Sequence, residues 1–335
     1  MSNIEKSPFK FGCLPTCEAS RHLRAAQTAT AKSLDFLWEN QSEMPAITWD
    51  SALVKWLDQK GDQADELRER GICCLPWVVL AALPKDRKTS DELYFTQGAV
   101  NDCAFHSDAF AYHATLLSAL IAKGAPLTYR PINPIVGYYL SEPGNWGGRT
   151  IAQTTEQSNR YGRYPIDLVG ANNQNVPKGY QDHEEDAKRF QLGFAYLPGQ
   201  GDELVKNIVR CCRADMGISF GNMLEVVGCS KDKNGVKVPK FGGRWMHATS
   251  ISNYRKVGST EYVWWSNSHG GLYKGSTEGD PDDGCWMRVE DQLVRFAATM
   301  STFDAPYLHF CEGTFASLWS FRPTLDLRFP DGFKR

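Results

Sequence analysis

The sequence predicts an α+β fold with two unlike lobes, a helical lobe first and a β-rich lobe second. Helix-type apolar patterns are spread over the first two thirds of the chain, with helices expected over residues 18–40, 50–70, 103–123, 150–161 and 202–213. Short β-type runs then follow one another at 216–220, 223–227, 246–254, 261–266 and 285–289. A series of helices followed by a series of strands is typical of α+β proteins.

Local signals support the individual elements. Residues 48–50 supply a start signal for the second helix, and the largely apolar helix that begins at Cys103 is expected to stop at Gly124. Glycine, proline and asparagine dominate two further stretches, which are therefore predicted to be loops: 131–148 and 170–180.

Composition excludes several classes of partner. The 335 residues carry a net charge of −2 with both signs interspersed, so no footprint for nucleic acid is expected. The longest apolar run, 72–83, is too short to span a bilayer and contains Pro76. Residues 1–6 lack the apolar core of a secretory signal. The chain is therefore expected to bind neither nucleic acid nor membrane, and to be intracellular.

The ten cysteines are also informative. Two adjacent pairs, at 73–74 and 211–212, have a geometry that rarely permits a bridge between neighbours, and the others are scattered. Mostly buried thiols in a reducing, cytoplasmic environment fit this distribution. Cys13, Cys17 and His22 could bind zinc, but no second close pair accompanies them. No metal ion and no cofactor are expected.

Four residues form a candidate catalytic set. Cys103 opens a predicted helix, Gln97 precedes it by six positions, and His247 and Asn267 lie far downstream. Thiolate attack on a carbonyl needs a cysteine, an imidazole, a group that orients the imidazole and a donor for the oxyanion. Each residue alone has an ordinary structural interpretation, as a core cysteine, a loop amide, a core histidine or a turn residue. Their order along the chain favours the catalytic one.

Further segments in the same order carry a family resemblance. They are the glycine pair in 145–148, the helix and strand entry in 204–209 and 217–220, the His247 segment 242–248, the Asn267 segment 262–268, and the run 284–289. Together with the Gln97 to Cys103 spacing, they make residues 95–290 resemble the papain-like cysteine peptidases. In that family the histidine and asparagine follow the cysteine by roughly 130–150 residues. Here the separations are 144 (247 − 103) and 164 (267 − 103).

The resemblance implies a papain-like two-lobed fold, with a helical lobe over about 95–200 and a β lobe over about 201–290. It implies a Cys103, His247 and Asn267 triad, an oxyanion donor at Gln97, and a peptide or isopeptide substrate. The implied substrate-binding residues are Trp146, Gly147 and Gly148. Residues 1–94 are then expected to be a largely helical docking region, and 291–335 an aromatic-rich extension.

The chain also departs from the family. Ala104 replaces the aromatic residue after the cysteine, and His269 replaces the tryptophan after the Asn-Ser pair. The second change predicts that the hydrogen bond between His247 and Asn267 lacks an apolar shield. Residues 217–221 match the pattern Gly-x-Ser-x-Gly, but a helix comes shortly before them, so Ser219 is not expected to be a nucleophile.

Two functions of different classes therefore stay open. The first is a papain-like thiol hydrolase that acts on a peptide or protein. The second is a structural or adaptor subunit of a large assembly, for example a virion-associated protein, with a papain-like fold and little or no activity. The four candidate residues favour the first, and the departures at Ala104 and His269 favour the second.

Overall fold

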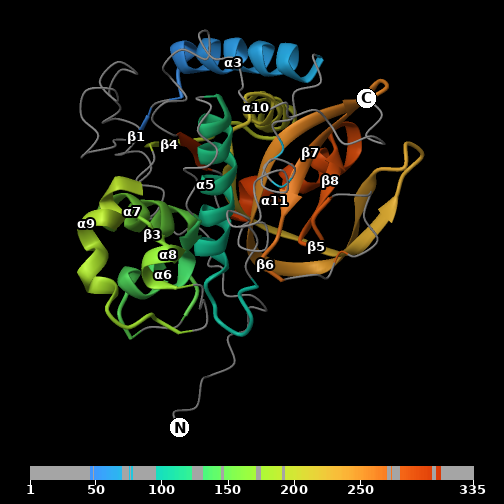
Figure 1. The fold of residues 1–335 in the computed structure, drawn as a ribbon. Coiled ribbons are helices and arrows are strands. Elements are labelled where there is room, and N and C mark those ends of the chain that lie inside the picture. The colour runs from blue at the N-terminus through green and yellow to red at the C-terminus, as the bar shows by residue number, and fades with distance from the viewer. Residues whose placement is uncertain are drawn as a thin grey trace.

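The computed structural model describes residues 46–47, 49–69, 75, 77, 96–122, 131–144, 147–170, 175–190, 193–269, 273, 280–303 and 307–310. A long central helix, α5 (Cys103–Ala122), separates short helices on one side from a curled antiparallel sheet on the other (Figure 1). The predicted α+β fold with two unlike lobes is confirmed. The expected helix over 18–40 lies outside the described residues.

The β lobe is one large sheet. Its strand order within the described ranges is β1-β4-β9-β5-β6-β7-β8, and all neighbours are antiparallel except β1 and β4. The strands are β1 (Ala46–Ile47), β4 (Gly193–Tyr196), β5 (Ile218–Lys231), β6 (Lys237–Val257), β7 (Thr260–Ser266), β8 (Gly284–Arg288) and β9 (Tyr307–Phe310). The two runs expected at 216–220 and 223–227 belong to one strand, β5, which is interrupted by register shifts against β6 after Asn222.

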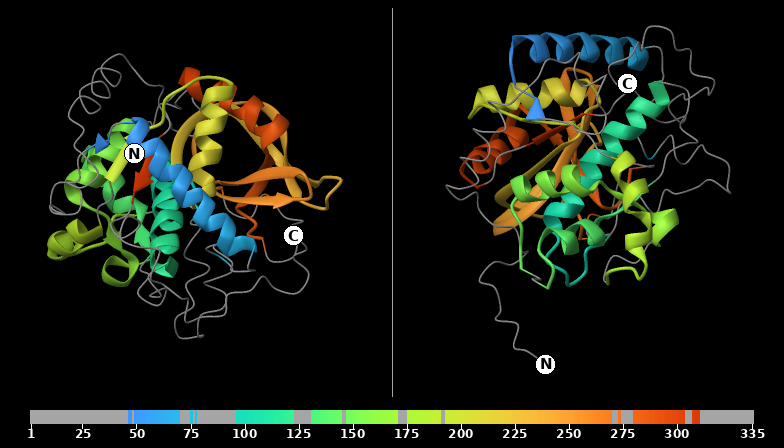
Figure 2. Two further views of the ribbon diagram at one scale, coloured as in Figure 1. Left: turned by 90° about the horizontal axis from the view of Figure 1, so that it is seen from above. Right: turned by 90° about the vertical axis from the view of Figure 1, so that its left-hand side faces the viewer.

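The helices fall into two groups. Beside α5, the helical lobe contains α6 (Pro134–Ser141), α7 (Ile151–Tyr161), α8 (Ile166–Val169), α9 (Glu184–Ala187), the 3-10 turns η4 (Tyr180–His183) and η5 (Lys188–Phe190), and a small ladder of β2 (Ile132–Asn133) with β3 (Tyr164–Pro165). The β lobe is covered by α3 (Ser51–Glu69), α10 (Asp202–Arg213), the π-turn η6 (Val289–Leu293) and α11 (Val294–Phe303). Figure 2 shows α3 lying across the top of the molecule, above α10 and the upper end of α5.

One predicted loop is a helix. The prediction for 131–148 was wrong at α6, because the glycine and proline content hid a helix start. Asn133 caps this helix by accepting a hydrogen bond from the backbone N–H of Ile135 at 2.9 Å, and Pro134 occupies the first turn, where no backbone donor is needed. Ile135, Val136 and Tyr138 are buried. An asparagine followed by proline is thus a helix start here and not a turn.

Two other helices, α7 and α10, lie where the sequence predicts them. Helix α7 begins with a capping box, in which Thr150 Oγ1 accepts from the backbone N–H of Gln153 at 3.1 Å and Gln153 Oε1 accepts from that of Thr150 at 2.9 Å. Helix α10 turns Leu204, Ile208 and Cys211 into the core. Its basic residues, on the other side, bind acidic residues of α3.

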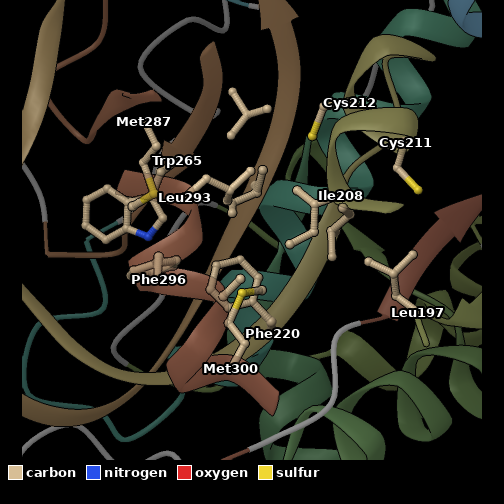
Figure 3. Packing of buried hydrophobic residues seen from close by; sticks show 14 of the residues in the cluster. Leu197, Ile208, Cys211, Cys212, Phe220, Trp265, Met287, Leu293, Phe296 and Met300 are labelled. Atoms are coloured by element: carbon tan, nitrogen blue, oxygen red, sulfur yellow. The ribbon is translucent and has the colours of Figure 1, made fainter. Parts of the chain in front are cut away.

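The core of the β lobe lies between the sheet and helices α10 and α11. Figure 3 shows this packing, with Phe220, Trp265 and Met287 from the strands meeting Ile208 from α10 and Phe296 from α11. The rings of Phe220 and Phe296 meet edge to face, with centroids 5.5 Å apart, an arrangement that aromatic pairs prefer. No helix in the described part of the chain is long and apolar enough to cross a membrane.

Candidate active site

Cys103 is the first residue of α5. The backbone carbonyl of Asp102 accepts from the N–H groups of Phe105 and His106 at 2.9 and 3.1 Å, which starts the helix at this point. The thiol therefore sits at the N-terminal end of a 20-residue helix, which is the positive end of the helix dipole. Its side chain is fully buried.

Two hydrogen bonds fix how α5 lies against the sheet. The hydroxyl of Ser107 donates to the backbone carbonyl of Thr249 on β6, and further along α5 Thr115 Oγ1 accepts from the backbone N–H of Gly217 at 2.8 Å. Gly217 immediately precedes the pair formed by Ile218 and Ile251, so the helix and β6 run in the same direction.

Four helical residues and two strand residues have nearly the same rise, about 6 Å and about 6.7 Å. Stepping back by one turn from Ser107 reaches Cys103, and stepping back by two residues from Thr249 reaches His247. Cys103 also shares an apolar cluster with Ala248, the residue after His247. The start of α5 therefore lies beside the part of β6 that carries His247, a residue 144 positions (247 − 103) after Cys103.

Asn267 holds the imidazole. Its Oδ1 atom lies 2.6 Å from His247 Nε2, and its Nδ2 atom donates to the hydroxyl of Tyr273 at 2.6 Å. The same Oδ1 accepts from the backbone N–H of Ser268 at 2.8 Å. Both ends of the amide are therefore engaged, and all three side chains are buried.

Two aromatic rings enclose the imidazole. His269 stacks on His247 with ring centroids 4.5 Å apart and an interplanar angle of 29°, and Trp245 lies against it at 4.7 Å. Trp245 is itself anchored, since its indole N–H donates to Asn222 Oδ1 at 2.6 Å. Two rings thus pack on the imidazole of His247, although the tryptophan expected after the Asn-Ser pair is absent.

Electrostatics at this site favour a neutral histidine. Burial is the largest cause that lowers the pKa of His247 well below its usual value, and the neighbouring His269 acts in the same direction. The hydrogen bond to Asn267 acts in the opposite direction.

Gln97 links the two lobes beside the triad. Its backbone N–H donates to the carbonyl of Ser268 at 2.8 Å, and its Oε1 accepts from the Ser268 hydroxyl at 2.5 Å. Its Nε2 donates to the backbone carbonyl of Val100 at 2.8 Å, and a primary amide carries two such donors. The predicted oxyanion donor, Gln97, is thus bonded to Ser268, the residue after Asn267, and to Val100, which precedes Cys103 by three positions.

The predicted substrate-binding glycines are held by a buried arginine. Arg149 donates to the carbonyls of Gly147 and Gly148 at 2.8 and 3.1 Å, and the hydroxyl of Tyr138 also donates to the Gly147 carbonyl at 2.8 Å. The guanidinium lies 5.0 Å over the Tyr138 ring. These contacts fix the backbone of the glycine pair. Trp146, predicted with them, lies outside the described residues.

A second histidine and a carboxyl lie beside Cys103 at the start of α5. Asp102 Oδ2 is 3.3 Å from His106 Nε2, and both side chains are fully buried. Burial raises the pKa of the Asp102 carboxyl, and the His106 ring opposes this shift. The sequence reading did not single out this pair as part of the site.

The competing motifs have structural roles. Ser219 of the Gly-x-Ser-x-Gly match is buried inside β5, paired with Ser250 on β6, and no helix follows it. Within the described ranges, no three His, Cys, Asp or Glu side chains lie close enough together to hold a metal ion.

Comparison with known proteins gives structural matches only. No family model and no curated protein matches the sequence. Among solved structures, xylellain, a cysteine protease from Xylella fastidiosa, matches with 14% identity and a TM-score of 0.45 over 65% of this chain and 82% of its own. Digestive procathepsin L 3 of Tenebrio molitor matches with 11% identity and a TM-score of 0.44, over 88% of this chain and 98% of its own. Procathepsin B S9 from Trypanosoma congolense matches with 11% identity and a TM-score of 0.40, over 66% of this chain and 72% of its own.

The chain resembles papain-like cysteine proteases. At identities this low, what the side chains of this chain do has to be inferred from their own geometry.

Several residues of the site were missed from the sequence. Trp245 lies two positions before His247, and strand periodicity alone places both on one face. Tyr273 could have been noticed as a lone aromatic residue in a polar, glycine-rich segment after Asn267. Asp102 and Arg149 offered no such signal, because a charged residue in a loop is ordinarily exposed.

Proposed function

We propose that this protein is a thiol hydrolase that cleaves peptide or isopeptide bonds with Cys103 as its nucleophile. One observation supports this above all: Cys103, at the N-terminus of α5, packs in one apolar cluster with Ala248 of β6, the residue after His247, and Asn267 Oδ1 lies 2.6 Å from His247 Nε2. A nucleophile, a base within reach and a group that orients the base are the requirements for covalent catalysis.

The steps follow from the residues present. Asn267 Oδ1 is an acceptor, so it selects the tautomer with the proton on Nε2 and leaves Nδ1 to take the proton of Cys103. The thiolate then attacks the substrate carbonyl, and a tetrahedral oxyanion forms. The imidazolium returns its proton to the leaving amine, which breaks the C–N bond and leaves a thioester on Cys103. A water molecule, deprotonated by His247, hydrolyses that thioester.

The oxyanion needs donors that are in place before the reaction. The two donors we assign are the backbone N–H of Cys103, in the first turn of α5, and the side-chain amide of Gln97. We expect Gln97→Ala to lower kcat about 100-fold to 1,000-fold, the usual cost of losing one such donor. The glycine pair held by Arg149 is assigned to the substrate backbone, since glycine allows close approach.

Labelling with a peptide-like, thiol-reactive probe such as a peptidyl epoxide tests the proposal. The wild type is expected to be labelled at Cys103, and Cys103→Ala is expected to lose the label. Cys229→Ser is the matched control, because Cys229 is a partly exposed thiol outside the site. Equal labelling of wild type and Cys103→Ala would contradict the hydrolase and favour the structural or adaptor role in a larger assembly.

A further inference from the structure

A buried arginine and a buried tyrosine lie beneath the glycine pair that is assigned to the substrate. Gly147 and Gly148 are half-buried, whereas Arg149 is 2% exposed and Tyr138 is 0% exposed. The two enclosed side chains are therefore too deep to bind a substrate themselves. Any effect they have on a bound peptide has to pass through the backbone of the glycine pair.

The guanidinium of Arg149 joins the end of α6 to the glycine pair. Its Nε donates to Ser141 Oγ at 2.8 Å. One terminal nitrogen donates to the carbonyls of Gly147 and Gly148 at 2.8 and 3.1 Å, and the other donates to that of Glu142 at 3.5 Å. Ser141 is the last residue of α6, so the cation also lies at the negative end of that helix. Donors on three separate nitrogens are specific to arginine, because lysine offers all of its donors from one atom.

The hydroxyl of Tyr138 holds one of the same carbonyls. It donates to the Gly147 oxygen at 2.8 Å, and the Tyr138 ring lies 5.0 Å from the guanidinium of Arg149. Burial raises the pKa of Tyr138, although Arg149 opposes this shift, so the hydroxyl keeps its proton and stays a donor. A carbonyl oxygen has two lone pairs, and two donors from inside the protein engage that of Gly147. The orientation of this peptide group is therefore fixed from below.

The same network is connected to the helix that carries the nucleophile. The Tyr138 ring meets the ring of Phe105 edge to face, with centroids 6.0 Å apart, and Phe105 follows Cys103 by two positions on α5. On the other side of the glycine pair, Ile151 and Ala152 at the start of α7 share an apolar cluster with Cys103. The glycine pair is thus held between two segments that each pack against the start of α5.

We propose that Arg149, together with Tyr138, is a positioning residue that holds the glycine pair in the orientation needed to bind an extended peptide backbone beside Cys103. This role rests on the proposed thiol hydrolase and adds the groups that make its peptide recognition possible. Without the guanidinium, the two glycine carbonyls are released, and glycine is the residue whose backbone rotates most freely. The reactivity of Cys103 toward a small reagent should not change, because such a reagent makes no use of the glycine pair.

Two thiol reagents of different length test the proposal in the full chain. A peptidyl epoxide extends along the glycine pair and iodoacetamide does not, and mass spectrometry of the Cys103 peptide gives the rate constant for each. Arg149→Lys, which keeps the charge but loses the fork, is expected to react about 10-fold more slowly with the epoxide and as fast as the wild type with iodoacetamide. Tyr138→Phe should show the same pattern with a smaller fall. Arg160→Lys, on an exposed arginine of α7, is the matched control and should keep both rates.

Peptide turnover gives a second measurement. The glycine pair binds the same backbone in the ground state and in the transition state, so Arg149→Lys should raise KM about 10-fold and change kcat little. Urea midpoints identify the variants that are folded; should Arg149→Lys not fold, Tyr138→Phe decides by the same ratio of rates.

The ratio of the two rates also separates this proposal from the hydrolase. Equal falls with both reagents, or an unchanged rate with the epoxide, would overturn the positioning role of Arg149 and leave the hydrolase intact. No reaction of the epoxide with Cys103 in the wild type would overturn both.

Discussion

Asn267 and His247 form a fixed pair in which the amide of one determines the orientation of the other. Oδ1 of Asn267 lies 2.6 Å from Nε2 of His247, and its Nδ2 donates to the Tyr273 hydroxyl at 2.6 Å. Because each end of the amide has its own partner, a flipped amide would place donor against donor. Tyr273 therefore acts on the imidazole through Asn267, although it does not touch the ring through a hydrogen bond of its own.

Tyr273→Phe tests this chain of hydrogen bonds. Removing the hydroxyl leaves the buried Asn267 N–H without that acceptor, which costs about 1–3 kcal/mol and loosens the amide. We expect kcat on a peptide substrate to fall about 10-fold, equivalent to about 1.4 kcal/mol of barrier, with KM unchanged. A purely structural role for Tyr273 would lower the unfolding midpoint and leave kcat as it is. The control is Tyr139→Phe, on a half-buried tyrosine of α6 in the other lobe.

His269→Phe tests the second ring that covers His247. The phenyl ring keeps the stacking, whose centroids are 4.5 Å apart, but removes a group that lowers the His247 pKa. The His247 pKa should rise as a result. The imidazolium is needed to protonate the leaving amine, so the basic limb of the kcat/KM profile should move to higher pH. An unshifted limb would mean that His269 only packs against the site.

The helical lobe is fastened to α5 by a buried ion pair. Arg163 donates from Nε and one terminal nitrogen to the two oxygens of Asp108, each at 2.9 Å, and Ser158 adds a third hydrogen bond at 3.1 Å. Breaking such a pair leaves a buried charge without compensation, so Asp108→Asn should lower the free energy of unfolding by about 3–5 kcal/mol in denaturant titrations. Glu185→Gln, which breaks an exposed pair with Lys188, should leave it nearly unchanged. Similar effects of the two changes would show that the burial of Asp108 is not decisive.

The order of helices and strands was predictable because it depends on local signals. Helix α10 spans 202–213, as the apolar spacing predicts, and α7 begins at the Thr150 cap. Helix α6 was missed because an Asn-Pro start looks like a turn until Ile135 and Val136 are known to be buried. Strand β6 was predicted only in part. Its residues before position 246 were missed, since their pairing with β5 depends on partners distant in sequence.

The candidate site was predictable where chemistry restricts the residue type. Cysteine, histidine, asparagine and glutamine were each singled out for a property of the side chain. The side chains that position these residues were not singled out, because their roles arise from the curl of the sheet and from burial. Trp245 covers His247 only because β6 places the two side chains on one face, and Asp102 is buried only because α5 runs beneath β6.

The close approach of α5 to the sheet depends on a glycine. A Cβ atom on Gly217 would lie 2.2 Å from the backbone oxygen of Ala111 and 2.5 Å from its Cα, so Gly217→Ala has to push the helix away from β5. The backbone N–H of Gly217 also donates to Thr115 Oγ1 at 2.8 Å, which that shift would weaken. We expect a loss of about 1–3 kcal/mol in the free energy of unfolding.

Activity should fall further than stability in Gly217→Ala, because the same displacement separates Cys103 at the start of α5 from His247 on β6. A displacement of 1 Å can cost about 100-fold in rate. Gly243→Ala is the matched control on β6, since its Cβ would meet only the end of the flexible Glu225 side chain, which can move aside. Circular dichroism melts and kcat/KM measured on both variants separate the two effects. Loss of stability in Gly217→Ala with full activity in the folded fraction would show that α5 does not set the distance between nucleophile and base.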